Sequence, residues 1–361
     1  MACRRRHLTS TIGLLLGYAM CIGCSQGSAD APALSSMPSA PATVTPPTVV
    51  AGSGSRQAKL TYQIGPFDLP AGTAAEAMRE QPGKVRFRVD EPMWVTAFEP
   101  RIEDGDGAPL PGSLLHLAII ANHAETNPLC TAKQMGNPFA AATASLKQIT
   151  LPPGSGYAVL PDDPLSASVI LHNPSEQDYH NVYFTFTLTA EPLKTAKTMT
   201  DVAPLLLDMD PCDHAPLAIE PNGYVKKSQQ FNLPETGRLM QAYGLLQHYG
   251  VEIALGKESA DKPFWKAAAM IDAEHQIVSL PAFDDPSGVA VNQGDPIHLS
   301  VAYDNVQERW LTDATAAAMV YVARVDTTDG ATATTKPLRK TAMRVGQVQS
   351  LLIQSRRETR D

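Results

Sequence analysis

From Lys59 to about Val325 the sequence consists of short runs with strand character, separated by turn residues at intervals of roughly 8–12 residues. Lys84-Val-Arg-Phe-Arg-Val89 alternates polar and apolar side chains, which is the period of a half-buried strand. Leu114 to Ala121 is almost continuously apolar, as expected of a central strand. This pattern predicts an all-β fold built of antiparallel, jelly-roll-like β-sandwiches.

Other runs with the same texture are expected to form the remaining strands. They are Met93–Phe98, Gly156–Leu160, Ala167–His172, Asn181–Thr189, Tyr224–Phe231, Arg238–Leu246, Val251–Leu255, Lys266–Ile271, Ile297–Tyr303 and Ala316–Arg324. Clusters of turn residues at 103–107, 221–223, 284–288 and 292–296 separate some of them. Thr73–Glu80 is expected to form a short helical turn capped by Thr73.

The length of this β-rich part suits two domains of ordinary size. We place the boundary near residues 195–205, because Leu193-Lys-Thr-Ala-Lys-Thr-Met-Thr200 loses the strand pattern. The expected organisation is an N-terminal sandwich over 59–200 and a C-terminal sandwich over 201–326. Residues 327–361 are expected to form a tail in which Arg344–Ser355 could fold as one amphipathic helix.

The first 24 residues have the features of a secretory signal, namely a cationic head at Arg4-Arg5-Arg6, a short apolar stretch and small residues before a cut site. The apolar stretch is too short to span a bilayer. The segment Cys21-Ile-Gly-Cys24 resembles the lipobox of bacterial lipoproteins, although Cys21 stands where an aliphatic residue is usual. An ordinary signal cut nearby, or export by the twin-arginine route, is the alternative.

The lipobox resemblance implies cleavage before Cys24 and acylation of that residue. Two or more acyl chains hold a protein stably on a membrane, so the membrane is the expected partner of the N-terminus. Ser25, rather than Asp, at the next position favours the outer membrane of a bacterial envelope. Residues 25–58 are rich in Ala, Pro, Ser and Thr and are expected to form a disordered linker between the anchor and the folded body.

The charge balance argues against nucleic acid as a partner. The chain carries 29 basic and 37 acidic residues, and three of the basic ones belong to the predicted signal. A protein that neutralises phosphates needs a basic stripe, and the sequence has none in the predicted mature part. A protein or a small molecule is the expected partner of this acidic body.

Two of the five cysteines, Cys130 and Cys212, remain outside the signal and the anchor. Outside the cytoplasm two such thiols usually pair. The sequence therefore predicts a Cys130–Cys212 disulfide. Two buried free thiols, or a pair of ligands for a soft metal, are the alternatives.

Three histidines and one methionine are the candidates for a metal site. His116 lies inside Leu114-Leu-His-Leu-Ala-Ile-Ile120, and His172 is the last residue of the expected strand Ala167–His172. His248 follows the run that ends at Leu246, and Met319 lies in an Ala-rich strand. Imidazole and thioether ligands suit copper that cycles between its two oxidation states.

The order and context of these segments resemble the copper type II, ascorbate-dependent monooxygenases, whose peptidylglycine monooxygenase-like members fold as a double jelly roll. The resemblance extends over roughly Tyr62 to Val325. It includes the turn Ala108-Pro-Leu-Pro-Gly112 before Leu-Leu-His116, and also Leu151-Pro-Pro-Gly-Ser-Gly156, Leu-His172-Asn-Pro and Ala318-Met319. It implies one copper in each domain, the first held by a His-His pair and a third His, the second by a His-x-His pair and a Met.

Only part of that ligand set is present. His116 matches one member of the His-His pair, and Leu115 and Leu117 occupy the neighbouring positions. His172 matches the third ligand and Met319 the Met ligand. The His-x-His positions read Leu245-Leu246-Gln247, with His248 one residue later. Because side chains alternate along a strand, His248 is expected to point away from the face that Leu245 and Gln247 share.

We therefore expect an envelope lipoprotein on a degenerate copper-monooxygenase scaffold, non-catalytic, that binds a partner, a ligand or, weakly, a metal. The alternative is an active copper-dependent monooxygenase that uses His116, His172, His248 and Met319 in altered geometry. Each residue also has a structural interpretation: His116 as a hydrogen-bonded core residue, His172 as a strand end and Met319 as core filling. His123, His180, His214 and His275 are expected on the surface.

Overall fold

The structure is a computed structural model, and it describes residues 43–44, 48–51, 57–79, 82–130, 135–145, 148–194, 199–258 and 260–324. All of them belong to one compact unit of the chain, Ala40–Asp361. Strands dominate these residues, so the predicted all-β fold is confirmed. The predicted signal, Cys24 and the tail from residue 327 lie outside the described residues.

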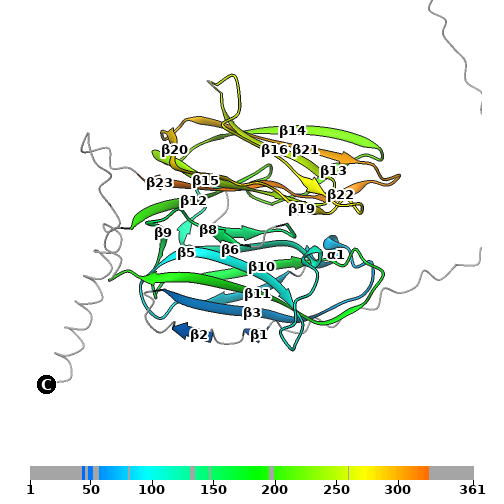
Figure 1. Ribbon diagram of the computed structural model, residues 1–361, viewed down its shortest axis with the longest axis horizontal. Helices are drawn as coiled ribbons and strands as arrows, with labels where there is room; N and C mark the ends of the chain where they lie inside the picture. Colours follow the sequence, from blue (N-terminus) through cyan, green and yellow to red (C-terminus); the bar gives the residue numbers. More distant parts are fainter. Residues whose placement is uncertain are drawn as a thin grey trace, which may run out of the picture. The chain divides into compact units, whose positions relative to one another are not determined.

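The first sandwich packs two sheets face to face (Figure 1). One sheet holds β1 (Thr43–Val44), β2 (Thr48–Ala51), β3 (Ala58–Leu69), β5 (Met93–Glu103), β8 (Ile149–Thr150), β9 (Ser155–Val159) and β11 (Tyr179–Pro192). The other has the order β4 (Gly83–Phe87), β10 (Leu165–Leu171), β6 (Leu115–Thr126) and β7 (Gly136–Ala142). A short helix, α1 (Ala75–Arg79), and a 3-10 turn, η1 (Gly112–Leu114), lie in its connections.

The second sandwich packs two layers of four strands each. One has the order β12 (Thr200–Asp208), β23 (Ala316–Arg324), β15 (Gly237–Leu246) and β20 (Phe283–Val291), and β12 also pairs in parallel with β9. Through this pairing the layer continues the larger sheet of the first sandwich, and together they form a sheet of 11 strands in the described part of the chain. The other layer has the order β14 (Gly223–Asn232), β21 (Pro296–Asn305), β16 (Gly250–Lys257) and β17 (Trp265–Ala268). Two small ribbons complete it: β13 (Leu217–Ile219) with β22 (Leu311–Ala314), and β18 (Met270–Ile271) with β19 (Ile277–Ser279).

Strand β23 contributes to both hydrophobic cores, because successive side chains of a strand point to opposite faces. Met319 and Tyr321 join the core of the first sandwich. Ala318, Val320 and Val322 join the core of the second. The sheet that contains β23 therefore packs on its own sandwich with one face and on the first sandwich with the other.

Two buried tyrosines fix this contact between the sandwiches. The hydroxyl of Tyr321 donates to the carbonyl of Phe139 at 2.9 Å, and that of Tyr243 donates to the carbonyl of Ala141 at 3.2 Å. Both carbonyls belong to β7. A buried tyrosine hydroxyl needs such a partner, so these two bonds set where β15 and β23 lie on β7.

The predicted disulfide is confirmed: Cys130 and Cys212 are joined, with an S–S distance of 2.11 Å. Cys130 follows β6, and Cys212 follows β12, so the bond links a loop of the first sandwich to a loop of the second. The two residues are 82 positions apart in the sequence.

Each predicted run of strand texture overlaps a strand, and a short helix lies inside Thr73–Glu80 as predicted. The run Lys266–Ile271 is divided between β17 and β18, which belong to different sheets. The predicted turn at 284–288 differs, because these residues lie within β20. There the pairing shifts from Leu239↔Val289 to Gln241↔Asp284, so the residues between bulge out of the ladder. Two short strands, β1 and β2, fall within the predicted linker and pair with β3.

None of the helices in the described residues has the length and apolar character needed to cross a bilayer.

The predicted boundary at 200/201 falls at the start of β12. This strand pairs with β23 of the second sandwich over its length and with β9 of the first at its beginning.

Candidate metal site

His116 is the extra residue of a β-bulge in β6. Strand β10 pairs Ile170 with Leu117 and then Leu171 with Leu115, so His116 has no partner across the ladder. A bulge redirects the side chain of its extra residue and is common next to functional sites. The His116 side chain is fully buried, and the aliphatic residues on either side of it are buried as well.

His172 reaches the same place from the neighbouring strand. It follows the last residue of β10, and its backbone N–H donates to the carbonyl of Leu114 at 3.0 Å. Because β10 and β6 are antiparallel, the end of one lies beside the start of the other. The rings of His116 and His172 meet edge to face with centroids 5.3 Å apart.

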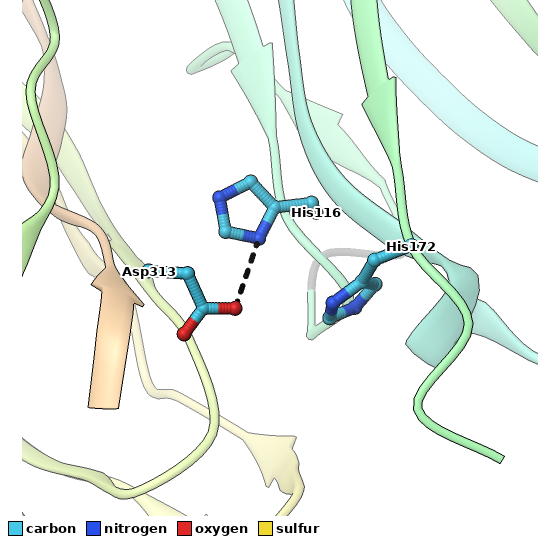
Figure 2. Close-up of side chains that lie close together, drawn as sticks. All are labelled: His116, His172 and Asp313. Carbon is cyan, nitrogen blue, oxygen red and sulfur yellow. Dashed lines mark ion pairs between the residues drawn. The ribbon is translucent and has the colours of Figure 1, made fainter. Parts of the chain in front are cut away.

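The second sandwich contributes a carboxylate, Asp313, from β22. Its Oδ2 atom lies 4.0 Å from Nδ1 of His116. Figure 2 shows the two imidazoles and this carboxylate approaching one another from three separate segments. His116, His172 and Asp313 each offer one ligand atom, and these atoms lie within 4.8 Å of one another. A group of residues able to hold a metal ion therefore lies between the sandwiches.

His248 lies beside this group, and the expectation that it points away was wrong. Its Nε2 atom lies 3.9 Å from Oδ1 of Asp313, and its ring centroid lies 6.2 Å from that of His172. Strand β15 ends at Leu246, and the chain turns at Tyr249 with a positive φ of 64°. Alternation of faces applies only within a strand, so it could not predict the direction of a side chain in this turn.

The other residues at the expected second site do not form one. Leu245 lies in the hydrophobic core of the first sandwich. Gln247 does point toward the first sandwich, where its side-chain amide donates to the backbone carbonyl of His116. Met319 is fully buried in the same core as Leu245, paired with Leu206 and Tyr243 on the neighbouring strands. Its surroundings are those of a core residue.

Burial favours the neutral form of two of the imidazoles, His116 and His248. Burial, with the nearby charges of His172, Arg79 and His248, lowers the pKa of His116 to about 2. Burial also lowers the pKa of His248, against the opposing effect of the Asp313 carboxylate. A neutral imidazole has a free lone pair and is the form that binds a metal.

Two ring nitrogens of the group have unmet hydrogen-bonding capacity. Nδ1 of His116 and Nδ1 of His248 are both buried, and neither has a hydrogen-bond partner among the described residues. Buried polar atoms are nearly always satisfied, so the unsatisfied Nδ1 of His116, which faces the Asp313 carboxylate, is unusual. A cation held by His116 and the carboxylate would give Nδ1 of His116 the partner that it lacks.

The donor set fits a divalent transition metal after a small contraction. Imidazole nitrogen and carboxylate oxygen bind zinc at about 2.0–2.2 Å, so their atoms lie at most about 4 Å apart around one ion. The three ligand atoms here lie within 4.8 Å, so shifts of about 1 Å would bring them into range. Within the described residues this is the one group of three or more His, Cys, Asp or Glu side chains with such a spacing.

An arginine and a second His–Asp pair adjoin the site, and the sequence did not indicate either of them. Arg79, the last residue of α1, lies with its Nη2 atom 2.8 Å from Nε2 of His116. Its Nη1 atom donates to the backbone carbonyl of His214 at 3.4 Å. His214 is not the surface residue that we expected, because it is largely buried and its Nδ1 atom lies 2.8 Å from Asp208.

The sequence signals for these neighbours are weak. Asp313 stands in Leu311-Thr-Asp-Ala314, where nothing distinguishes it from a surface carboxylate. Asp210-Pro-Cys-Asp-His214 does have the composition of a metal-binding segment, but Cys212 is in the disulfide. The side chains of His116 and Asp313 are almost 200 positions apart and meet only because the two sandwiches pack together.

No family model matches the sequence, and no curated protein does. Among solved structures, the chain is similar to a chain of the Sulfolobus turreted icosahedral virus, with 9% identity over 73% of this chain and 90% of that one and a TM-score of 0.36. It is also similar to PBCV-1 VP54 as fitted into a reconstruction of the virophage Sputnik, with 7% identity, coverage of 76% and 95%, and a TM-score of 0.29. Scores this low support no argument about function.

Proposed function

We propose that this protein is a lipid-anchored envelope protein that binds one divalent transition-metal ion between its two β-sandwiches. The observation that carries the proposal is the convergence of His116, His172 and Asp313, with an unsatisfied ring nitrogen on His116. His248 is close enough to the same carboxylate to serve as a fourth ligand. The scaffold would be a divergent relative of the copper monooxygenases, without their two-copper chemistry.

The chemistry of the donors favours copper(II) or zinc. Two or three imidazoles and a carboxylate are ligands that both ions accept, and their affinities for such sites are the highest among the common divalent first-row metals. No thiolate is available, since both cysteines of the described part are in the disulfide. The absence of a soft sulfur ligand from the group works against stabilisation of copper(I).

The alternative of an active, ascorbate-using copper monooxygenase needs two metal centres. The sequence pattern predicted that His248 points away from any metal. Its ring instead lies near His172, and this additional imidazole favours the monooxygenase alternative. The same residue, however, lies beside Asp313 and His172, so its imidazole belongs to the first group. Met319 is enclosed in the apolar core, and Leu245 is directed into the same core. We therefore favour a single, non-catalytic metal site.

Metal analysis of the full-length protein, purified in detergent and loaded with copper(II) or zinc, tests this proposal. We expect one ion per chain, and we expect its loss in the variants His116→Ala and His172→Ala. His180→Ala, a change at an exposed histidine, is the matched control and should retain the ion. Met319→Leu, which keeps the volume of the core, should retain it as well.

The outcomes separate the candidate functions. A native protein that takes up no ion would remove the proposed function. Two copper ions per chain with ascorbate-dependent oxygen uptake, and loss of one of them in Met319→Leu, would establish the monooxygenase instead. For the anchor, Cys24→Ser should release the protein from the membrane fraction, and unchanged fractionation would show that Cys24 is not acylated.

A further inference from the structure

Arg79 is placed where it contacts the proposed metal ligand directly. Its guanidinium lies with Nη2 2.8 Å from Nε2 of His116, and it is anchored on its other side by the carbonyl of His214. That carbonyl belongs to a loop fixed twice, by the Cys130–Cys212 disulfide and by the contact between His214 and Asp208. Arg79 therefore has a firm support in the position that it occupies.

This contact defines the tautomer of His116. A guanidinium has donors and no acceptor, and it keeps its proton in proteins. Nε2 of His116 must therefore be the acceptor, so the ring is neutral and its one proton is on Nδ1. Nδ1 is the atom that faces Asp313 at 4.0 Å. The atom that would bind a metal together with Asp313 thus carries a proton while Arg79 is in place.

A metal ion on Nδ1 requires the lone pair of that atom. The ring proton would then move to Nε2, with no net release of a proton. Two donors, the Nε2–H group of His116 and an N–H group of Arg79, would then face each other. Their distance of 2.8 Å suits only a donor and an acceptor, so the contact would be unfavourable. The two positive charges, metal and guanidinium, would also lie on opposite sides of one ring in a buried environment, where charges are poorly screened.

We propose that Arg79 and the metal ion compete for His116 from opposite sides of its ring, so that Arg79 holds the ring in the Nδ1-protonated tautomer until a metal ion displaces it. This inference rests on the proposed function, since it concerns the same ligands. Displacement is feasible because Arg79 ends α1, a helix of only five residues. Helices this short have little stability of their own, so the last turn can rearrange without disrupting the sandwich.

The consequence is a site whose affinity is set by a residue that is not a ligand. With Arg79 in place, metal binding must break the hydrogen bonds from Arg79 to His116 and to the carbonyl of His214. Removal of the guanidinium should therefore tighten metal binding, which is the opposite of what loss of a ligand or of a purely structural residue would do. Tighter metal binding in an Arg79 variant would indicate a competing residue, and weaker binding would indicate a ligand or a structural residue.

The test is a competition titration of the full-length protein with zinc or copper(II) against a chromophoric chelator. Arg79→Ala and Arg79→Met are compared with the native protein, the Met variant preserving the packing of the side-chain stem. We expect both variants to bind the ion about tenfold or more tightly, since this corresponds to a loss of one charged hydrogen bond from the competing state. Arg86→Ala, at an exposed arginine of β4, is the control and should bind as the native protein does.

Each outcome decides a separate point. Equal affinity of the native protein and both Arg79 variants, with loss of the ion in His116→Ala, would overturn the competition and leave the metal site intact. Failure of the native protein and the Arg79 variants alike to bind either ion would overturn both proposals.

A measurement without metal provides an independent check. Nitrogen NMR of isotope-labelled histidine rings in the metal-free protein should find the proton of His116 on Nδ1 in the native chain. It should also find that this preference weakens in Arg79→Met. A proton on Nε2 in the native chain would show that Arg79 does not donate to this ring, and the competition would be excluded even if the site binds metal.

Discussion

Asp313 is the residue through which the second sandwich takes part in the site. It contributes a carboxylate to imidazoles of the first sandwich, and it lies about equally far from His116 and His248, at 4.0 and 3.9 Å. A carboxylate that lies between two neutral imidazoles, without a direct hydrogen bond to either, is well placed to bind a cation together with them. The Asp313 carboxylate should therefore contribute more to metal affinity than to the stability of the metal-free protein.

We therefore predict that Asp313→Asn weakens binding of zinc or copper(II) by at least about tenfold, because the amide keeps the shape of the side chain but removes its charge. Isothermal titration calorimetry measures the change. The unfolding midpoint of the metal-free protein should change little. Asp261→Asn, at an exposed position, is the control. An unchanged affinity in Asp313→Asn would remove this residue from the ligand set.

The buried imidazole of His116 also gives the metal-free protein a dependence on pH. Its pKa is lowered to about 2 in the folded state, chiefly by burial, from an unfolded value near 6.5. Below the unfolded value the unfolded chain binds a proton that the folded chain does not, so stability falls as the pH falls. The loss approaches about 1.4 kcal/mol per pH unit for one such group.

Urea unfolding of the native protein and of His116→Gln, in the presence of a chelator, tests this dependence. The measurements run from about pH 7.5 to about pH 4.5, a range that includes the unfolded pKa of about 6.5. The native protein should lose stability faster than the variant as the pH falls below about 6.5, with the difference growing at up to about 1.4 kcal/mol per unit. At pH 7.5 the two slopes should agree. Parallel curves over the whole range would show that His116 is protonated in the folded protein.

Among the structural elements, the disulfide has the clearest energetic role. It links the loop after β6 to the loop after β12, across 82 positions of the sequence. A cross-link of this kind restricts the unfolded chain and typically stabilises a protein by about 2–4 kcal/mol. It also holds the segment whose carbonyl at His214 accepts a hydrogen bond from Arg79.

We predict that the double variant Cys130→Ser/Cys212→Ser has a free energy of unfolding lower than that of the native protein by about 2–4 kcal/mol. Urea unfolding measures the difference. Treatment of the native protein with a reductant should produce a similar loss, and the same treatment should leave the double variant unchanged. Equal stability of all forms would mean that the bond does not restrict the unfolded chain.

The strands were predictable because their signals are local. Lys84–Val89 alternates strictly, and it forms most of β4. Leu114–Ala121 is apolar except for His116, and β6 includes nearly all of it. Strands with mixed signals were not predicted. Gly136–Ala142, which forms β7, is rich in Ala, has a proline and lacks alternation because it is buried on both faces between the sandwiches.

The site was only partly predictable, for a related reason. His116 and His172 stood out as histidines within or at the end of apolar strands, and the structure brings them together. The direction of His248 depends on a turn that begins after Leu246, and the role of Asp313 depends on how the sandwiches pack. Neither a positive φ at Tyr249 nor a contact between distant segments leaves a periodic pattern in the sequence.

At the scale of the whole molecule, the two sandwiches are joined through a shared sheet face. Tyr321 and Met319 of β23 belong to the core of the first sandwich, although the strand is part of the second. Exposure of that face would leave large apolar side chains and two tyrosine hydroxyls without their partners. The sandwiches should therefore stabilise each other and unfold together.

This cooperativity can be measured with the tryptophans of the chain, which number three. Trp94 is buried in the first sandwich and Trp265 in the second, whereas Trp310 is exposed. In a Trp310→Phe background, removal of either buried tryptophan leaves one reporter for one sandwich. We predict that within each variant the urea midpoint from tryptophan fluorescence coincides with the midpoint from far-UV circular dichroism, which reports both sandwiches, since a two-state transition affects all probes of one protein alike.

The change Tyr321→Ala should then lower the midpoint of both reporters together, because a large buried aromatic side chain lost from a core costs about 3–5 kcal/mol. Tyr224→Ala, which removes an exposed tyrosine, is the control and should leave both midpoints in place. If Tyr321→Ala moved only one reporter, or if the fluorescence and circular dichroism midpoints of one variant differed, the sandwiches would be independent. A metal site built from ligands on both would then have to hold them together itself, and added zinc would bring the two midpoints into coincidence.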